Sequence, residues 1–257
     1  MNVLKFIGRR PFACVRLVSS LLSACVFALW GTARADAPGE IVVSFLEGSA
    51  EAGAGAPAVF KPLAVGDQLI EGEQIKTQAG ARLELRFASG TIVRVGENSS
   101  LVLTEAPPVG GRFRAKLLFG NFWAHVRKLL VGETFAVETE NAVAGVRGTI
   151  FRVESSSDAE LVRVYEGRVH VESRHAAHAS DLEGNHELRI GKDGAHGVST
   201  PFTPESEKKS PFIQWVHERQ KDGAGEERDR GNSKEREHKD RERKEREHDH
   251  AGTVHKE

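Results

Sequence analysis

The feature that most constrains the fold of this chain is a series of short segments in which apolar and polar residues alternate. Leu83 to Phe87 reads Leu-Glu-Leu-Arg-Phe, and Phe135 to Thr139 follows the same two-residue period. That period is typical of a strand with one buried face. Thr91 to Val95 is expected to be a strand that pairs with Leu83 to Phe87 across a turn. No long window shows the 3.6-residue period of a helix. The sequence therefore predicts an all-β domain, and a sandwich, a roll and a β-solenoid-like stack all remain open.

Turn residues between these segments predict how they connect. Ser89-Gly90 predicts a hairpin turn, because glycine accepts the positive φ that such turns need. Glu166-Gly167, between Leu161 to Tyr165 and Arg168 to Val171, predicts a second hairpin. Further strands are expected at Ile41 to Leu46, Ser100 to Thr104 and Glu187 to Ile190.

Two regions lack a clear period. Ala50 to Ala58 consists of small residues and is predicted to be a loop. Arg112 to Lys128 is interpreted as two strands with a turn at Gly120-Asn121, because glycine is unfavourable inside a helix. Its aromatic residues Phe119, Phe122 and Trp123 are expected to be core residues, since aromatic side chains dominate burial.

The first 35 residues have the pattern of a signal peptide. Basic residues precede an apolar run from Leu17 to Trp30, and Ala33-Arg34-Ala35 supplies the small residues that signal peptidase needs. The run is too short to span a bilayer as a helix. We expect cleavage before Asp36, no integral membrane span in the mature chain, and a periplasmic or extracellular location. The lipobox-like Leu22-Ser23-Ala24-Cys25 offers lipoprotein anchoring at Cys25 as a minor alternative.

The mature chain divides into three further parts. Residues 36–200 are expected to form the β-domain, and residues 201–222 a linker with a short helix that starts near Ser210-Pro211. Phe212, Trp215 and Val216 lie on one face of that helix, which suits docking on the domain or on a partner. Residues 223–257 are almost entirely charged and are expected to be a disordered tail.

Several segments together resemble the FecR domain family. Asn141 to Thr149, which reads Asn-Ala-Val-Ala-Gly-Val-Arg-Gly-Thr and is followed by Ile-Phe-Arg-Val, is similar to the family's signature. Other similar pieces stand around it in the family's order: Val65 to Asp67, Gly72 to Thr77, Leu83 to Gly90, Val164 to Val171 and Leu182 to Ile190. The resemblance implies a β-rich fold, an envelope location and protein contact.

The family's ferric-citrate regulators carry signals from outer-membrane receptors to cytoplasmic sigma factors, with an anti-sigma segment and a transmembrane helix before the FecR domain. In this chain a leader stands in that place. We therefore expect no contact with a sigma factor. What the resemblance still implies is contact with another protein in the envelope.

The signature residues Gly145, Val146, Arg147, Gly148 and Thr149 are the candidate site. Glycines around an arginine between strands usually serve a tight backbone path, so we interpret these residues as structural, with Arg147 bound to local carbonyl groups. The alternative is a recognition loop in which the Arg147 guanidinium binds a carboxylate.

No arrangement of residues predicts catalysis, a cofactor or a metal site. There is no nucleophile elbow and no phosphate-binding glycine loop. His170, His175, His178 and His186 fit no metal-ligand spacing.

We expect a non-enzymatic interaction or signal-relay module in the periplasm or at the cell surface, whose partner is an envelope protein. The balanced charge, 36 Lys and Arg against 37 Asp and Glu, argues against a nucleic-acid partner. Two alternatives stay open. One is an envelope structural or glycan-binding protein, and the other is a metal-handling protein that uses His248, His250 and His255 of the tail.

Overall fold

The computed structural model describes residues 41–55, 57–106, 111–175 and 177–221. They belong to one compact unit, Asp36–Glu257. The predicted signal peptide (1–35) and the predicted charged tail (223–257), with its three histidines, lie outside the described residues. Among the described residues, no helix is long and apolar enough to cross a membrane.

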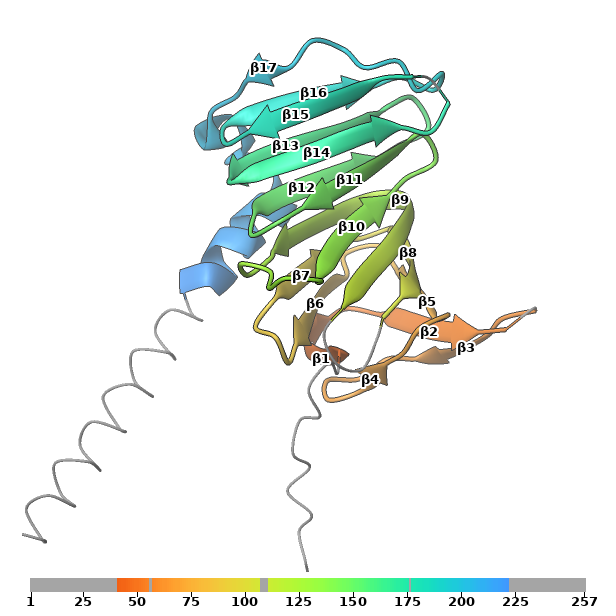
Figure 1. Ribbon diagram of the computed structural model, residues 1–257. Coiled ribbons are helices and arrows are strands. Elements are labelled where there is room, and N and C mark those ends of the chain that lie inside the picture. Colours follow the sequence, from red (N-terminus) through yellow and green to blue (C-terminus); the bar gives the residue numbers. More distant parts are fainter. Residues whose placement is uncertain (1–40, 56, 107–110, 176, 222–257) are drawn as a thin grey trace, which may run out of the picture. The chain divides into compact units, whose positions relative to one another are not determined.

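The strands form two sheets that share one long strand, β9 (Arg112–His125) (Figure 1). Sheet A contains, in order, β4 (Gln68–Leu69), β1 (Ile41–Glu47), β6 (Arg82–Phe87), β7 (Ile92–Val95), the end of β9, β12 (Ile150–Ser155), β13 (Glu160–Glu166), β16 (His186–Ile190) and β17 (Thr200–Pro201). Sheet B contains β3 (Val59–Pro62), β2 (Ala50–Ala54), β5 (Gln74–Thr77), β8 (Ser100–Glu105), the start of β9, β10 (Thr134–Glu138), β11 (Ala142–Val146), β14 (Arg168–Ser173) and β15 (Ala179–Glu183). The pairing of β9 with β10 is parallel, and the other pairings are antiparallel.

The hydrophobic core lies between the two sheets. Sheet A contributes side chains such as Leu85 and Phe151, and sheet B contributes others such as Leu103 and Val137, all of them at most 1% exposed. Because one cluster draws on both sheets, the all-β prediction is confirmed, and the arrangement is a two-sheet sandwich that is not closed into a barrel.

The turn predicted at Gly120-Asn121 is wrong. β9 continues through it as one 14-residue strand that pairs in sheet B up to Phe119 and in sheet A from Gly120. Gly120 has φ +101°, and a Cβ there would lie 2.1 Å from Ser99 Oγ. The glycine therefore bends the strand from one sheet into the other instead of ending it.

The loop predicted at Ala50 to Ala58 is wrong for its first part, because Ala50–Ala54 forms strand β2, which pairs with β3 after the turn. A Cβ at Gly53 would lie 2.5 Å from the Val59 carbonyl oxygen. The small residues allow this close approach of two backbones. They also erase the apolar period that would have predicted strands.

The predicted hairpin around Gly167 is a crossover between sheets. β13 pairs with β12 and β16 in sheet A, whereas β14 pairs with β11 and β15 in sheet B. The predicted chain reversal at Gly167 is present, but β13 and β14 join different sheets, on opposite sides of the core, instead of pairing with each other.

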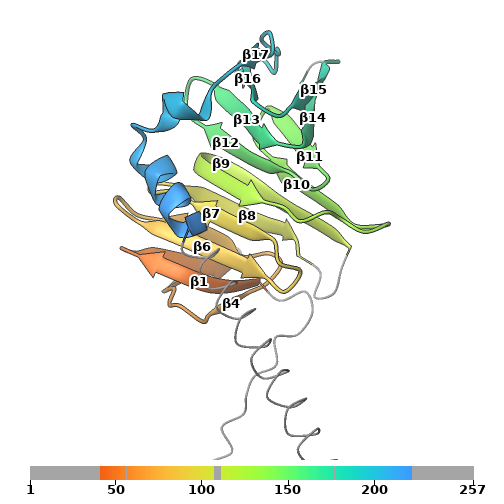
Figure 2. The same ribbon diagram turned by 90° about the vertical axis from the view of Figure 1, so that its left-hand side faces the viewer.

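The segment after the sandwich covers the outer face of sheet A. A 3-10 helix, η1 (Pro204–Glu207), is followed by a helix at residues 211–221 that lies against β6, β7 and β9 (Figure 2). Trp215 and Val216 are buried against Trp123, and Phe212 packs beside them. The structure thus places the predicted apolar stripe on the chain's own domain.

Candidate functional site

Three crossovers between the sheets stack on one another at one end of the sandwich. They are residues 126–133 between β9 and β10, residues 147–149 between β11 and β12, and residues 166–168 around Gly167; we call them the crossover edge. Val126 N donates to Thr149 O at 2.9 Å, and Thr149 N donates back to Val126 O at 3.1 Å. Thr149 Oγ1 donates to Arg168 O at 3.0 Å, which ties the third crossover to the second.

The two signature glycines differ in what the fold demands of them. Gly148 has φ +81°, and a Cβ there would lie 3.1 Å from Lys128 Cα. Gly145 has no positive φ, and the nearest atom to its Cβ would be His170 O at 3.9 Å. Gly148 is therefore required by the crossover, whereas Gly145 is not required by the local packing.

Substituting these glycines should separate their roles. We expect Gly148→Ala to lower the free energy of unfolding by about 1–2 kcal/mol, because alanine is strained at positive φ. Gly145→Ala should change it by less than about 0.5 kcal/mol. Urea unfolding of both variants beside the wild type measures the difference, and equal losses in the two variants would contradict this account.

Arg147 is exposed at the middle crossover. Among the described residues, no hydrogen bond or ion pair joins its guanidinium to another group, so the expected attachment to local carbonyl groups is wrong. The physical reason is strand alternation. Val146 pairs with Phe135 and points into the core, which turns the next side chain outward.

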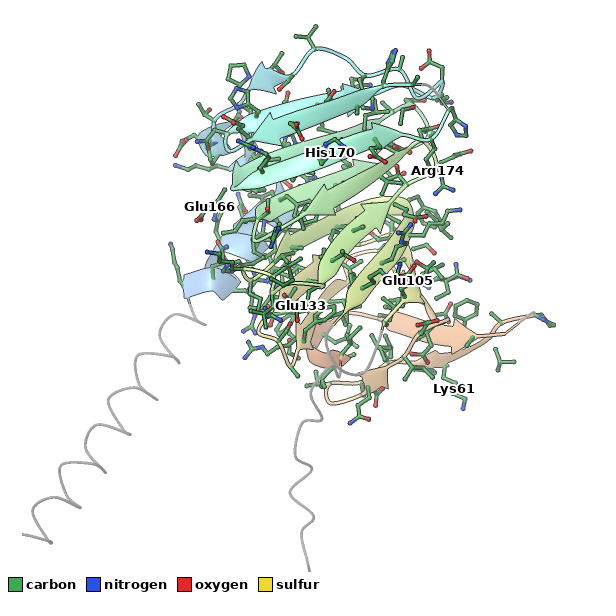
Figure 3. The ribbon with its side chains drawn as sticks, in the orientation of Figure 1. Lys61, Glu105, Glu133, Glu166, His170 and Arg174 are labelled. Carbon is green, nitrogen blue, oxygen red and sulfur yellow. The ribbon has the colours of Figure 1, made fainter. Side chains whose placement is uncertain are left out.

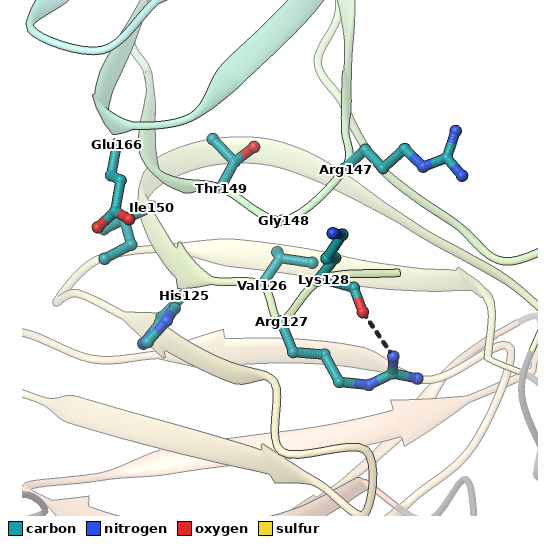
Figure 4. A pocket seen from close by; sticks show the side chains of 9 residues that line it. All are labelled: His125, Val126, Arg127, Lys128, Arg147, Gly148, Thr149, Ile150 and Glu166. Atoms are coloured by element: carbon teal, nitrogen blue, oxygen red, sulfur yellow. Dashed lines mark hydrogen bonds between the residues drawn. The ribbon is translucent and has the colours of Figure 1, made fainter. Parts of the chain in front are cut away.

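A hollow of about 360 Å³ opens at the crossover edge (Figure 4). It is lined by His125, Val126, Arg127, Lys128, Arg147, Gly148, Thr149, Ile150 and Glu166. Lys128 is exposed and, within the described part of the chain, has no ion pair. The charges of the lining are separated. The acidic side chain of Glu166 lies on one side, together with His125, and the basic side chains of Arg127 and Arg147 lie on the other.

The first crossover is held in a fixed shape by Glu133 (Figure 3). Arg127 Nη2 donates to both carboxylate oxygens of Glu133, at 2.7 and 2.8 Å, and Leu130 N donates to it at 2.8 Å. These donors hold the pKa of Glu133 below its usual value, the Leu130 N–H contributing most. The ordered turn leaves Leu130 66% and Val131 96% exposed.

The aromatic prediction is right for two residues and wrong for one. Phe122 lies in the core and Trp123 under the C-terminal helix, but Phe119 is 51% exposed. Phe119 precedes the bend at Gly120, where the strand leaves sheet B. At such a bend the regular alternation of inward and outward side chains is interrupted, so an apolar side chain there is not directed into the core.

The four histidines of the β-region do not come together. His170 contacts Asp181 at 2.7 Å on the outside of sheet B, and this hydrogen bond raises the pKa of His170 (Figure 3). His175 contacts the Glu140 carbonyl, His178 packs on His196, and His186 contacts the Gly184 carbonyl. No group of three metal-binding side chains occurs within the described residues.

Sequence reasoning missed an ionic network beneath the C-terminal segment. Glu207 of η1 accepts hydrogen bonds from Arg152 Nη1 at 2.5 Å, Arg163 Nη1 at 2.6 Å and Tyr165 Oη at 2.5 Å. Burial and the Glu207 carboxylate raise the pKa of Tyr165. No local pattern could have predicted this, because the partners lie 42 to 55 positions apart.

A second part of this network lies farther along the helix. Arg94, 2% exposed, donates through Nε to Glu84 at 2.8 Å and through Nη1 to the Val216 carbonyl at 3.2 Å. Its guanidinium lies over the Trp123 ring, 4.8 Å from the ring centre. Glu84 of β6 and Arg94 of β7 are thus buried beneath the C-terminal helix, whereas Arg82 and Arg86 of β6 stay partly exposed.

The fold and the edge define an all-β domain whose sheets are linked by glycine-bearing crossovers. Arg147, Gly148 and Thr149 form the middle crossover, and Arg147 is exposed there. Residues 73–170 match the family model described as FecR protein. The match confirms the sequence resemblance to the FecR domain family over these residues.

A search of the solved structures also matches this chain to two structures, at 1.65 and 2.50 Å resolution. Each is described as a "putative anti-sigma factor" from Parabacteroides distasonis ATCC 8503, with 17% sequence identity and a TM-score of 0.47. Each match covers 55% of this chain, and the chain spans 64% of the length of those structures. A search of the curated proteins finds no match.

Proposed function

We propose that this chain is an exported, non-enzymatic signal-relay or interaction protein whose FecR domain contacts an envelope protein through the crossover edge. The observation that carries the proposal is the position of Arg147. The signature crossover uses Gly148 and Thr149 to hold its shape and leaves Arg147 exposed. Arginine is a frequent anchor of protein interfaces, since its planar fork binds carboxylates with defined geometry.

The surroundings of Arg147 suit binding better than catalysis. The crossover edge combines cations with the exposed apolar side chains of Leu130 and Val131. Exposed apolar side chains next to an arginine suit a protein interface, because arginine is enriched there relative to the rest of the surface. Catalysis of acyl transfer would need a nucleophile hydrogen-bonded to a base, and the hollow's lining supports no such pair. The proposed export rests on the pattern of the first 35 residues.

In-cell photo-crosslinking tests the contact surface. A photoreactive amino acid at Val131, which is 96% exposed, is expected to capture one specific envelope protein. The same group at Val198, which is 84% exposed and lies outside the crossover edge, is the matched control and should not capture it. Mass spectrometry of the crosslinked envelope fraction identifies the product.

Charge reversal at Arg147 should remove most of this capture. We expect Arg147→Glu to reduce the crosslinked product at least tenfold, because it replaces a carboxylate-binding group with a repelling one. Arg189→Glu is the control, since Arg189 is also exposed and without an ion pair among the described residues. Equal capture by all three proteins would overturn the proposed surface. Loss of capture only after glycan digestion would instead favour an envelope glycan as the partner.

A further inference from the structure

We propose that the crossover edge recognises an acidic segment of its partner in which a carboxylate is flanked by apolar side chains. This inference rests on the proposed function and adds the chemistry that the edge binds. Three properties of the described residues carry it: unpaired cations at the hollow, an ordered apolar turn beside them, and a single acidic side chain opposite.

The cations are placed to hold one carboxylate. Lys128 and Arg147 both line the hollow, and the backbone of Gly148, the residue after Arg147, lies close to Lys128, since a Cβ on Gly148 would be 3.1 Å from Lys128 Cα. The third lining cation, Arg127, is already held by Glu133. Thr134 of β10 pairs with Arg112 of β9, and the next residue, Phe135, pairs with Val146 of β11. Arg112 and Arg147 therefore lie at the same end of sheet B, with Thr134 between them. Binding a carboxylate would give these cations the partner that the domain does not supply.

The apolar turn indicates what must flank that carboxylate. Leu130 and Val131 are exposed at the tip of a turn that the Arg127–Glu133 pair and the Leu130 N–H hold in place. An ordered apolar tip loses little conformational entropy on binding, so contact there is favourable. Phosphate and sulfate polymers have no side chains that would cover it. A peptide segment has side chains that can cover this apolar tip.

Glu166 disfavours a uniformly charged partner. It lies on the other side of the hollow from Arg147, and within the described residues it has no ion pair (Figure 4). A polyanion that filled the hollow would place a second anionic group next to this carboxylate and would be repelled. A partner with one carboxylate fits the hollow better. Its carboxylate meets the cations on the Arg147 side, and an apolar or hydrogen-bond-donating neighbour meets Glu166 on the other side.

The test measures the binding of fluorescein-labelled probes, three peptides and one polyphosphate, to the full chain by fluorescence anisotropy. Four probes of equal length are used: alternating Glu and Leu, alternating Glu and Ser, alternating Lys and Leu, and a polyphosphate. We expect the Glu-Leu peptide to bind at least tenfold more tightly than each of the other three. Its affinity should fall with added salt, since the cations are exposed.

Three variants locate the binding. Lys128→Glu with Arg147→Glu should abolish Glu-Leu binding, and Leu130→Ser with Val131→Ser should weaken it at least fivefold without affecting the Glu-Ser peptide. Arg189→Glu, the control, should bind like the wild type. Circular dichroism checks that each variant is folded.

Polyphosphate binding as tight as that of the Glu-Leu peptide would overturn the inference, as would equal losses in the edge variants and in Arg189→Glu. Failure of the inference differs from failure of the proposed function. If no peptide discriminates but Arg147→Glu still abolishes in-cell capture, the contact surface stands and the acidic-segment chemistry is wrong. If crosslinking captures no protein at Val131, the proposed function itself fails.

Discussion

Replacing Glu207 with alanine is expected to lower the free energy of unfolding by about 3 kcal/mol, at the lower end of the range for breaking a buried ion pair. Its side chain is 5% exposed, and its loss leaves Arg152, Arg163 and Tyr165 without a shared acceptor. The loss should not be larger, because Arg152 keeps Glu154 and Arg163 keeps Glu187.

Urea unfolding followed by tryptophan fluorescence measures this change. Glu205→Ala is the matched control, because Glu205 lies on the same turn and its side chain is 68% exposed. Among the described residues, Lys208 at 3.8 Å is its only ion-pair partner. Surface pairs of this kind contribute little, so the control should lose less than about 0.5 kcal/mol. A loss below about 1 kcal/mol in Glu207→Ala would show that the network does not hold the C-terminal segment.

The second large effect is expected from the site of truncation. A chain that ends at Thr203 loses η1 and the helix at residues 211–221, whereas a chain that ends at Lys221 keeps both. The shorter chain exposes Trp123 and the Arg94–Glu84 pair and removes Ile213, Trp215 and Val216 from burial. Each large apolar side chain contributes about 1.5–3 kcal/mol when buried, so we expect a loss on the order of 5 kcal/mol.

Tryptophan fluorescence reports this directly, because Trp123 and Trp215 both lie in the contact between sheet A and the helix. The emission of the chain ending at Thr203 should shift to the red relative to the chain ending at Lys221, and its urea midpoint should fall. Identical spectra and midpoints would show that the segment does not stabilise the sandwich. Any test of the charged tail should therefore use the chain ending at Lys221.

Local patterns predicted the strands with a two-residue period, because alternation in sequence records which side chains face the core. Leu83 to Phe87, Phe135 to Thr139 and Glu187 to Ile190 lie in strands β6, β10 and β16 within a residue or so. Strands built from small residues, such as Ala50–Ala54, carry no such record. Their existence depends on the close backbone approach at Gly53, which involves Val59.

The candidate site divides in the same way. Sequence resemblance identified the segment from Gly145 to Thr149, but only the structure shows that Gly148 is needed for its φ and that Arg147 is left outside. The contribution of Lys128, Leu130 and Glu166 to the same surface was not predictable. They come from two other crossovers, and stacking brings them together.

The sequence by itself determined the class of this protein: an all-β domain of short strands that resembles the FecR family, followed by a short amphipathic helix. These follow from periods and turn residues that act over a few positions. The tertiary structure alone decided which strands share a sheet, that Gly167 joins two sheets, and that Glu207 meets Arg152 and Arg163. Such contacts depend on long-range burial and on charge pairing beneath the C-terminal segment, and no short window of sequence encodes them.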